Sequence, residues 1–157
     1  MIRIRASRAA DAERLDELMH TSAAYQGRYA SILVGYRVTP AYLERTPTWV
    51  AVDSAGIIGG FASLQIEPPE IDLMFVSDEL QGSGIGRELV VRLLDDAVRR
   101  GLARLRVVAH PAAEGFYRRL GAERIGAVPP SPPRVTWERP ELVFRLGPEV
   151  SATGVSG

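Results

Sequence analysis

The sequence of 157 residues contains no cysteine and no lysine, and all 19 of its basic side chains are arginines. Without cysteine there is no disulfide, no thiol nucleophile and no cysteine-ligated zinc. Without lysine there is no Schiff-base amine, no lysine general base and no Walker-type phosphate-binding lysine. The two histidines, His20 and His110, lie far apart in the sequence. We therefore expect no metal in this protein.

The charge is balanced, with 19 acidic side chains against the 19 arginines. Nucleic-acid-binding domains usually carry a basic excess, so we expect no nucleic-acid partner. Charged residues interrupt the apolar pairs near the N-terminus, which therefore lacks the apolar run of a signal peptide or a membrane span. We expect a cytoplasmic protein with no membrane partner. We also expect a single domain over residues 1–147 and a disordered tail over 148–157, where the periodicity ends.

Segments with alternating apolar residues interleave with segments of helical period, which predicts a mixed α/β (α+β) domain. Its sheet has six or seven strands, and about four helices pack on it. Short turns join the second, third and fourth strands, which are therefore expected to be antiparallel neighbours. The expected strands cover residues 2–6, 49–52, 57–66, 70–76, 105–109, 123–128 and 142–146. The expected helices cover residues 10–20, 85–100 and 112–120, and two short ones follow residue 22, the second beginning after Thr39.

One loop carries most of the chemical information: Gln81-Gly82-Ser83-Gly84-Ile85-Gly86-Arg87 follows a strand and opens the longest amphipathic helix. Alternate glycines let the backbone turn its N–H groups inward, and the unpaired donors of a helix N-terminus attract anions such as phosphate. Arg87 places a positive charge in the first turn, where the helix dipole alone prefers a negative one. A bound anion would account for it.

Glycines in this pattern also occur in three other kinds of loop. A Walker loop requires a lysine, so it is excluded. A dinucleotide fingerprint requires the third glycine one position later than Gly86, and an acidic residue after the next strand, which here ends in Ala109-His110. A strand-to-helix turn without a ligand stays open on the loop alone.

The loop resembles the pyrophosphate-binding signature of the GCN5-related N-acetyltransferase (GNAT) superfamily, Gln/Arg-x-x-Gly-x-Gly/Ala. A second segment, Ala113-x-x-Phe116-Tyr117-x-x-x-Gly121-Ala122, is similar to another motif of that family and lies at the right distance. The order of elements is similar over residues 2–146. The resemblance implies a mostly antiparallel mixed sheet, splayed between its fourth and fifth strands, with acetyl-CoA as co-substrate in the opening.

The resemblance also implies the residues that hold the cofactor. Its pyrophosphate would lie on the backbone from Gly82 to Arg87, after Gln81, and its pantetheine arm would pair with Phe75 and Val76. The family commonly has an asparagine seven residues before its tyrosine, whereas this chain has His110, whose imidazole offers a donor or a second acid-base group. A surface or turn role for His110 is the alternative.

Acetyl transfer to an amine needs a base for the amine and an acid for the departing thiolate. Tyr117 matches the family's tyrosine, so its hydroxyl is the candidate acid, with a packed core aromatic as the alternative. Glu70 and Asp72 are candidate bases, because alternation along a strand places them on one face. Glu70 lies eleven positions before Gln81, as in the family's histone-acetyltransferase branch. A solvated carboxylate is the alternative for either.

In this superfamily the acceptor binds to the first variable helices and a late loop, here residues 25–36 and 129–140. Tyr25, Tyr29, Tyr36 and Trp137 are candidates for an aromatic acceptor pocket, in which Arg28 and Arg134 hold a carboxylate. Core packing is the alternative for each tyrosine.

The sequence thus predicts an acetyl-CoA-dependent N-acetyltransferase of a small-molecule primary amine, which reacts by direct attack because no cysteine exists to carry an acyl group. Two alternatives stay open: a non-catalytic CoA-binding or regulatory module of the same fold, and a protein or peptide acetyltransferase. Family members often form dimers through late strands, so a homodimer through residues 123–146 is possible.

Overall fold

A computed structural model of the chain describes residues 1–147 and contains one seven-stranded sheet in the order β1-β2-β3-β4-β5-β7-β6. All neighbouring strands are antiparallel except β4 and β5, which run parallel. The strands are β1 (Arg3–Ala6), β2 (Thr48–Val52), β3 (Ile58–Gln65), β4 (Glu70–Val76), β5 (Arg104–Val108), β6 (Glu123–Val128) and β7 (Arg139–Arg145). This confirms the predicted mixed, mostly antiparallel sheet. The tail predicted for 148–157 lies outside the described residues.

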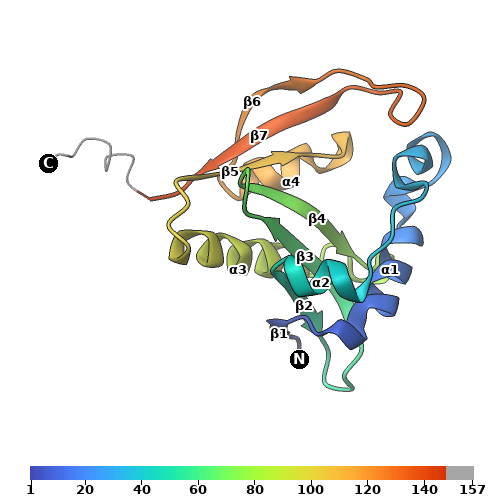
Figure 1. Ribbon diagram of the computed structural model, residues 1–157, viewed down its shortest axis with the longest axis vertical. Coiled ribbons are helices and arrows are strands. Elements are labelled where there is room, and N and C mark those ends of the chain that lie inside the picture. The colour runs from blue at the N-terminus through green and yellow to red at the C-terminus, as the bar shows by residue number, and fades with distance from the viewer. Residues whose placement is uncertain (148–157) are drawn as a thin grey trace, which may run out of the picture.

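Helices cover both faces of the sheet (Figure 1). On one face lie α1 (Ala12–His20) and α2 (Pro40–Arg45), and on the other α3 (Ile85–Arg99) and α4 (Glu114–Arg119). Each pair encloses its own apolar cluster against the strands, one centred on Leu15 and Phe61 and the other on Leu89 and Leu105. Two cores on opposite faces of one sheet hold the strands between them.

The segment between α1 and α2 differs from the expectation of two α-helices. It contains the short 3-10 helices η2 (Ala23–Tyr25) and η3 (Gly27–Leu33), and only α2 is α-helical. Thr39 caps α2 as predicted, since its hydroxyl accepts a hydrogen bond from the Tyr42 N–H at 3.1 Å. The predicted helix over 112–120 is likewise divided into η5 (Pro111–Ala113) and α4. Proline and glycine in these stretches favour short helical turns.

The long helix α3 packs through Ile85, Leu89, Val90 and Leu93, all buried. These residues recur at the three- and four-residue spacing of an amphipathic stripe. Val98, which the sequence pattern included in this stripe, is 51% exposed because it lies near the last turn and off the buried side. Its N-cap residue is Gly84, which has a left-handed conformation with φ of 92°.

Strands β4 and β5 pair at one position, where Glu70 at the beginning of β4 lies opposite Arg106 in the middle of β5, and the Arg106 N–H donates to the carbonyl of Pro69 at 3.1 Å. Beyond this point the described residues form no further β4–β5 pairing, so the two strands splay apart toward Val76. The splay lies between the fourth and fifth strands, as predicted, and the parallel direction of this pair is a finding of the structure. On the side of β4 that faces β5, backbone polar groups are left for another partner.

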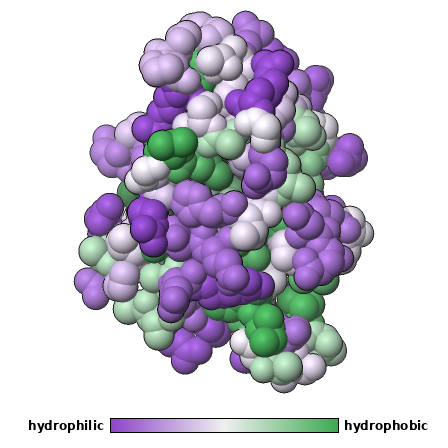
Figure 2. Space-filling view, turned by 90° about the vertical axis from the view of Figure 1, so that its right-hand side faces the viewer, coloured by the Kyte–Doolittle hydropathy of each residue, from purple (hydrophilic) through white to green (hydrophobic). Residues whose placement is uncertain are grey.

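Figure 2 shows the face that carries α1, with apolar side chains in separate patches among polar ones. Among residues 1–147, no helix is long and apolar enough to cross a membrane. The same residues contain no group of three or more His, Asp or Glu side chains placed to hold a metal ion.

We expect Leu89→Ala to lower the free energy of unfolding by about 2–5 kcal/mol, because it leaves a cavity in a fully buried position. Val98→Ala on the same helix is the matched control and should change it by less than about 0.5 kcal/mol. Denaturant unfolding followed by circular dichroism measures both. Equal effects of the two substitutions would contradict the assignment of the buried side of α3.

Candidate active site

The splay between β4 and β5 opens into a cleft with a volume of about 1020 Å³. Both carboxylates of β4, the glycine loop and α4 contribute to its walls, as do η3 and the segment between β6 and β7. The cleft therefore reaches both faces of the sheet. The predicted site residues that line it are Tyr25, Glu70, Asp72, Phe75, Val76, Gln81, Gly82, Gly84, Gly86, Arg87, His110, Tyr117 and Arg134.

The glycine loop forms one end of the cleft. Gly82 and Gly84 both have positive φ, at 79° and 92°, which side chains other than glycine rarely adopt. The Gln81 amide ties the loop back to β4 by donating to the Val76 carbonyl at 2.9 Å. A Cβ on Gly86 would lie 3.2 Å from the Met74 side chain, so glycine keeps α3 close to β4. The loop thus presents the free N–H groups of the first turn of α3 to the cleft.

Two arginines stand at this end of the cleft. Arg87 lies in the first turn of α3 and Arg119 at the end of α4, and both line the opening. Within the described residues neither forms an ion pair or a side-chain hydrogen bond. Sequence reasoning named Arg87 but missed Arg119, whose only signal is its place two residues after Tyr117. Unpaired guanidinium groups beside a helix N-terminus suit a phosphate ligand.

Tyr117 lies in α4, where 5% of the residue is exposed and its ring packs edge-to-face against Phe116 and Phe144. Burial raises the pKa of its hydroxyl above the ordinary value, and the nearby Tyr25 hydroxyl acts in the same direction. The residue also lines the cleft. Tyr117 is therefore both packed in the core and in contact with the cleft, although these two roles were alternatives on the sequence alone.

Glu70 lies at the point where the splay begins. The Arg106 guanidinium donates to it at 3.2 Å and to Glu141 of β7 at 2.6 Å, bridging the two carboxylates. The hydrogen bond with Glu141 raises the pKa of Arg106, against partial desolvation and with the help of Glu70. Arg106 was not identified from the sequence, because its role depends on the strand order β4-β5-β7. It fixes the Glu70 carboxylate at the inner end of the cleft.

Asp72 is the extra residue of a β-bulge. Ser63 pairs with Leu73, and the next residue of β3, Leu64, pairs with Ile71, so Asp72 has no partner in β3. The fully buried Ser63 hydroxyl fills the bulge and accepts the Leu73 N–H at 3.0 Å. The alternation that suggested one face for Glu70 and Asp72 is interrupted here. Both carboxylates nonetheless line the cleft.

A chain of hydroxyl groups holds the Asp72 side chain. The Tyr42 hydroxyl donates to Asp72 at 2.5 Å and lies 2.7 Å from the Ser63 hydroxyl. Since the single proton of Tyr42 goes to Asp72, Ser63 is the donor in the second bond. Burial raises the pKa of Tyr42, and the hydrogen bond to Asp72 adds to this effect.

His110 joins the two halves of the molecule. Its Nδ1 accepts the Ala112 N–H at 3.0 Å, and its Nε2 lies 2.7 Å from the Ala24 carbonyl, to which it donates as the neutral tautomer. Tyr25 and Tyr29 pack against the ring, with centroids at 4.9 and 4.4 Å. Both ring nitrogens are thus engaged with the backbone, and contact with a pantetheine arm would require one of them to exchange its partner.

The predicted acceptor residues divide into two groups. Tyr25, Tyr36 and Arg134 line the cleft. Tyr29 packs behind it between His110 and Trp137, and Arg28 lies over the outer side of the Tyr29 ring at 5.2 Å. The first group meets the cleft directly, whereas the second supports its wall. Arg139, which the sequence analysis did not name, also lines the cleft.

The hairpin of β6 and β7 reaches across the cleft to η3 (Figure 1). The Ser31 hydroxyl donates to the Arg134 carbonyl at 2.6 Å, and Arg134 Nε donates to the Ile32 carbonyl at 3.2 Å. The Arg134 guanidinium also lies 5.7 Å from the centre of the Tyr36 ring. We call the end of the cleft with Glu70 and Asp72 the acceptor end, and these contacts between η3 and the hairpin form a roof over it.

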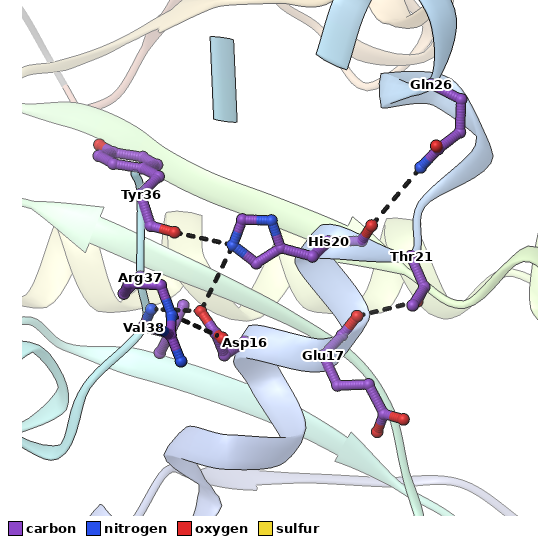
Figure 3. A network of polar contacts seen from close by, with 8 residues as sticks. All are labelled: Asp16, Glu17, His20, Thr21, Gln26, Tyr36, Arg37 and Val38. Carbon is purple, nitrogen blue, oxygen red and sulfur yellow. Dashed lines mark hydrogen bonds and ion pairs between the residues drawn. The ribbon is translucent and has the colours of Figure 1, made fainter. Parts of the chain in front are cut away.

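The stretch that follows η3, residues 36–38, is anchored to α1 (Figure 3). Asp16 accepts from Arg37 Nε at 2.9 Å and from the Val38 N–H at 2.8 Å, and His20 Nε2 lies 2.7 Å from the Tyr36 carbonyl. His20 thus bonds backbone near the end of α1 and does not reach the cleft. Residues 36–38 are thereby held in place, which orients Tyr36 at the cleft.

The geometry defines a transferase cleft with two different ends. One end has helix N–H groups and free arginines for phosphate, and the other has two fixed carboxylates under a roof. Between them, Tyr117 and the unpaired edge of β4 face the opening. Such an arrangement suits an extended phosphate-bearing cofactor that meets a second substrate at the inner end, as in acyl transfer from coenzyme A.

The model of the acetyltransferase (GNAT) domain family matches residues 13–128 of the chain. The chain therefore belongs to this family of N-acetyltransferases, which use acetyl-CoA. No curated protein sequence matches it significantly.

Solved structures agree with the fold. A putative acetyltransferase from Salmonella typhimurium, solved with its cofactor acetyl-CoA, superposes with a TM-score of 0.74 at 21% identity over 95% of this chain and 96% of the other. A phosphinothricin acetyltransferase from Sinorhizobium meliloti, in complex with acetyl-CoA, has a TM-score of 0.72 at 23% identity over 97% and 91%. The ribosomal-protein-S18-alanine N-acetyltransferase from Escherichia coli has a TM-score of 0.71 at 18% identity over 94% and 95%.

We expect Ser63→Ala to lower the free energy of unfolding by about 1–3 kcal/mol, because the Leu73 N–H is left buried without its acceptor. Ser54→Ala in the exposed β2–β3 turn is the control and should change it by less than about 0.5 kcal/mol. Urea unfolding measures both. If the two substitutions behave alike, Ser63 does not hold the bulge.

Proposed function

We propose that the protein transfers an acetyl group from acetyl-CoA to the primary amine of a small molecule, by direct attack in a ternary complex. The observation that carries this proposal is the meeting of Glu70, Asp72 and Tyr117 in one cleft whose opposite end suits phosphate. The absence of cysteine supports direct attack, because no thiol is present to carry the acetyl group.

The cofactor site follows from unpartnered groups. The N–H groups of Gly82, Gly84, the buried Ile85, Gly86 and Arg87 would hold the pyrophosphate, with Arg87 and Arg119 adding charge. The Ser83 N–H already donates to the Leu80 carbonyl at 3.1 Å and would have to exchange this partner to join them. The free edge of β4 at Phe75 and Val76 would pair with the amide groups of the pantetheine arm. When bound, acetyl-CoA supplies the activated acetyl thioester.

The residues of the inner cleft would then move two protons. Glu70 or Asp72, directly or through a water molecule, takes the proton of the acceptor ammonium group. The amine nitrogen would form the new C–N bond as the C–S bond breaks, and the Tyr117 hydroxyl would donate its proton to the departing thiolate. The nitrogen would then lose its second proton, directly or through water, to the Tyr117 oxygen, which leaves a neutral amide and restores the hydroxyl. Because burial raises the pKa of Tyr117, its hydroxyl keeps this proton throughout the neutral range.

The roof favours a small acceptor over a peptide. Ser31 and Arg134 close the acceptor end by direct hydrogen bonds, so an extended chain does not pass beneath them. The names of the neighbours with this fold include acetyltransferases of phosphinothricin and of a ribosomal-protein alanine. The fold alone therefore does not determine the acceptor, which depends on the side chains that line the cleft. The expected cytoplasmic location and the homodimer through residues 123–146 stay predictions.

Acetyl-CoA should bind to the purified protein with measurable heat in calorimetry and should raise its melting temperature. We expect Arg87→Gln to weaken this binding by about tenfold or more, since it removes one charge-assisted phosphate contact. Arg99→Gln, at the far end of the same helix, is the control and should leave the affinity unchanged. Absence of binding by the unmodified protein would overturn the proposed function.

Tyr117→Phe should lower kcat by about 100-fold or more, the typical contribution of a general acid, with little change in the affinity for acetyl-CoA. Steady-state assays of thiol release with a panel of amines measure this. In the unmodified enzyme, Tyr117 should cause no loss of kcat below about pH 10, because its pKa lies above the ordinary tyrosine value. Full activity of the variant would leave Tyr117 with its packing role, and binding without any turnover would favour a non-catalytic module.

A further inference from the structure

The arginines of the cleft share one feature. Arg87, Arg119, Arg134 and Arg139 all line it, and within residues 1–147 none of them forms an ion pair with a carboxylate. The first two stand at the phosphate end. Arg134 and Arg139 come from the segment that forms the roof, so a second group of unpaired positive charge lies on the acceptor side.

Arg139 is the first residue of β7. Its Nε atom is fully buried and has no hydrogen-bond partner in the described part of the chain. Its charge is felt at Tyr25, where it opposes the burial that raises the pKa of that hydroxyl to about 12. A buried, charged donor without an acceptor is costly, and a bound anion in the cleft would satisfy it.

Arg134 and the two carboxylates of β4 line the same cleft as Tyr36, and the Arg134 guanidinium lies 5.7 Å from the centre of the Tyr36 ring. Burial raises the pKa of the Tyr36 hydroxyl, Asp72 and Glu70 act in the same direction, and Arg134 opposes them. The Nε of Arg134 donates to the Ile32 carbonyl, and its terminal nitrogens have no hydrogen-bond acceptor among residues 1–147. The acceptor end thus contains both negative and positive groups near one aromatic ring.

The phosphates of acetyl-CoA would lie on the other face of the sheet from the contacts of Arg134. The phosphate-binding loop opens α3, which packs on one face, whereas Arg134 bonds Ile32 of η3, which packs against the core of the opposite face. Arg139 belongs to the same hairpin as Arg134. The pantetheine arm that would lie between the two faces is uncharged, so an acceptor that enters from the η3 side is the group that can supply an anion to Arg134 and Arg139.

We propose that the acceptor is an amino acid or a close analogue, with its amine toward Glu70 and Asp72 and its carboxylate on Arg134 and Arg139. This inference rests on the proposed function and specifies its substrate class. The remaining wall, formed by Ile32, Leu33, Tyr25 and Tyr36, suits an apolar or aromatic side chain. In this arrangement Arg139 takes the place that the sequence analysis gave to Arg28.

The experiment compares acceptors that differ only in the carboxylate: L-leucine, L-methionine and L-phenylalanine, each against its carboxamide. The amine of an amino amide is less basic than that of the amino acid, so a larger fraction of it is neutral and able to attack. If the enzyme does not recognise the carboxylate, the amide should therefore be the better substrate. We expect instead that kcat/KM is at least about tenfold higher for one or more of the acids than for the corresponding amide, which is the effect of one charge-assisted pair.

Arg139→Gln and Arg134→Gln should each raise KM for the acid and bring the ratio of acid to amide toward one, while KM for acetyl-CoA stays unchanged. Arg139→Lys should restore part of the preference and guards against a folding defect of the glutamine variant. Arg145→Gln is the matched control, because Arg145 belongs to the same strand but pairs with Glu123 on the surface at 3.0 Å.

Equal use of acids and amides by the unmodified enzyme, or a preference that survives both glutamine variants, would overturn this inference and leave the proposed function in place. Turnover of neutral amines without turnover of any acid would do the same. If acetyl-CoA binds and none of a broad panel of amines, acids and amides is acetylated, the proposed function itself fails.

Discussion

The incomplete pairing of β4 with β5 is the constraint on which the rest of the structure depends. Parallel strands in a sheet normally pair along their length, yet here the pairing stops after Glu70 and Arg106. The Arg106 guanidinium fixes the point where the pairing ends, because it donates to Glu70 of β4 and to Glu141 of β7 at the closed end of the splay. Helices on both faces then hold the two halves of the sheet apart, and the unpaired edge becomes the wall of a cleft.

The acceptor end is assembled from segments that are distant in the sequence. His110 connects the start of η5 to η2, and Ser31 connects η3 to the β6–β7 hairpin. In both contacts an uncharged side chain bonds a backbone carbonyl group. The contacts therefore hold η2, η3 and the hairpin in place without adding charge to the pocket. The charged groups of the pocket keep further hydrogen-bonding capacity for a ligand, since Arg134 uses only its Nε on the Ile32 carbonyl. His110 and Ser31 therefore act in positioning, whereas Arg134 takes part in both positioning and recognition.

Much of the fold and of the phosphate end could be predicted from the sequence, because their signals are local. The stripe around Leu89 predicts α3, and the glycines before Arg87 predict the loop. Arg106, Arg119 and Arg139 could not be found in this way. The role of Arg106 depends on which strands are neighbours, and that of Arg139 on what buries its Nε atom. Such contacts are set by tertiary packing, which periodicity does not encode.

The bulge in β4 has a consequence for how this strand tolerates insertion and deletion. Ile71 and Leu73 belong to cores on opposite faces of the sheet, although residues two apart in a regular strand share a face. If Asp72 were deleted, Ile71 and Leu73 would become adjacent and would keep these two faces in an unbulged strand. The core therefore has no need of Asp72. The extra residue instead places a carboxylate in the cleft without disturbing either core.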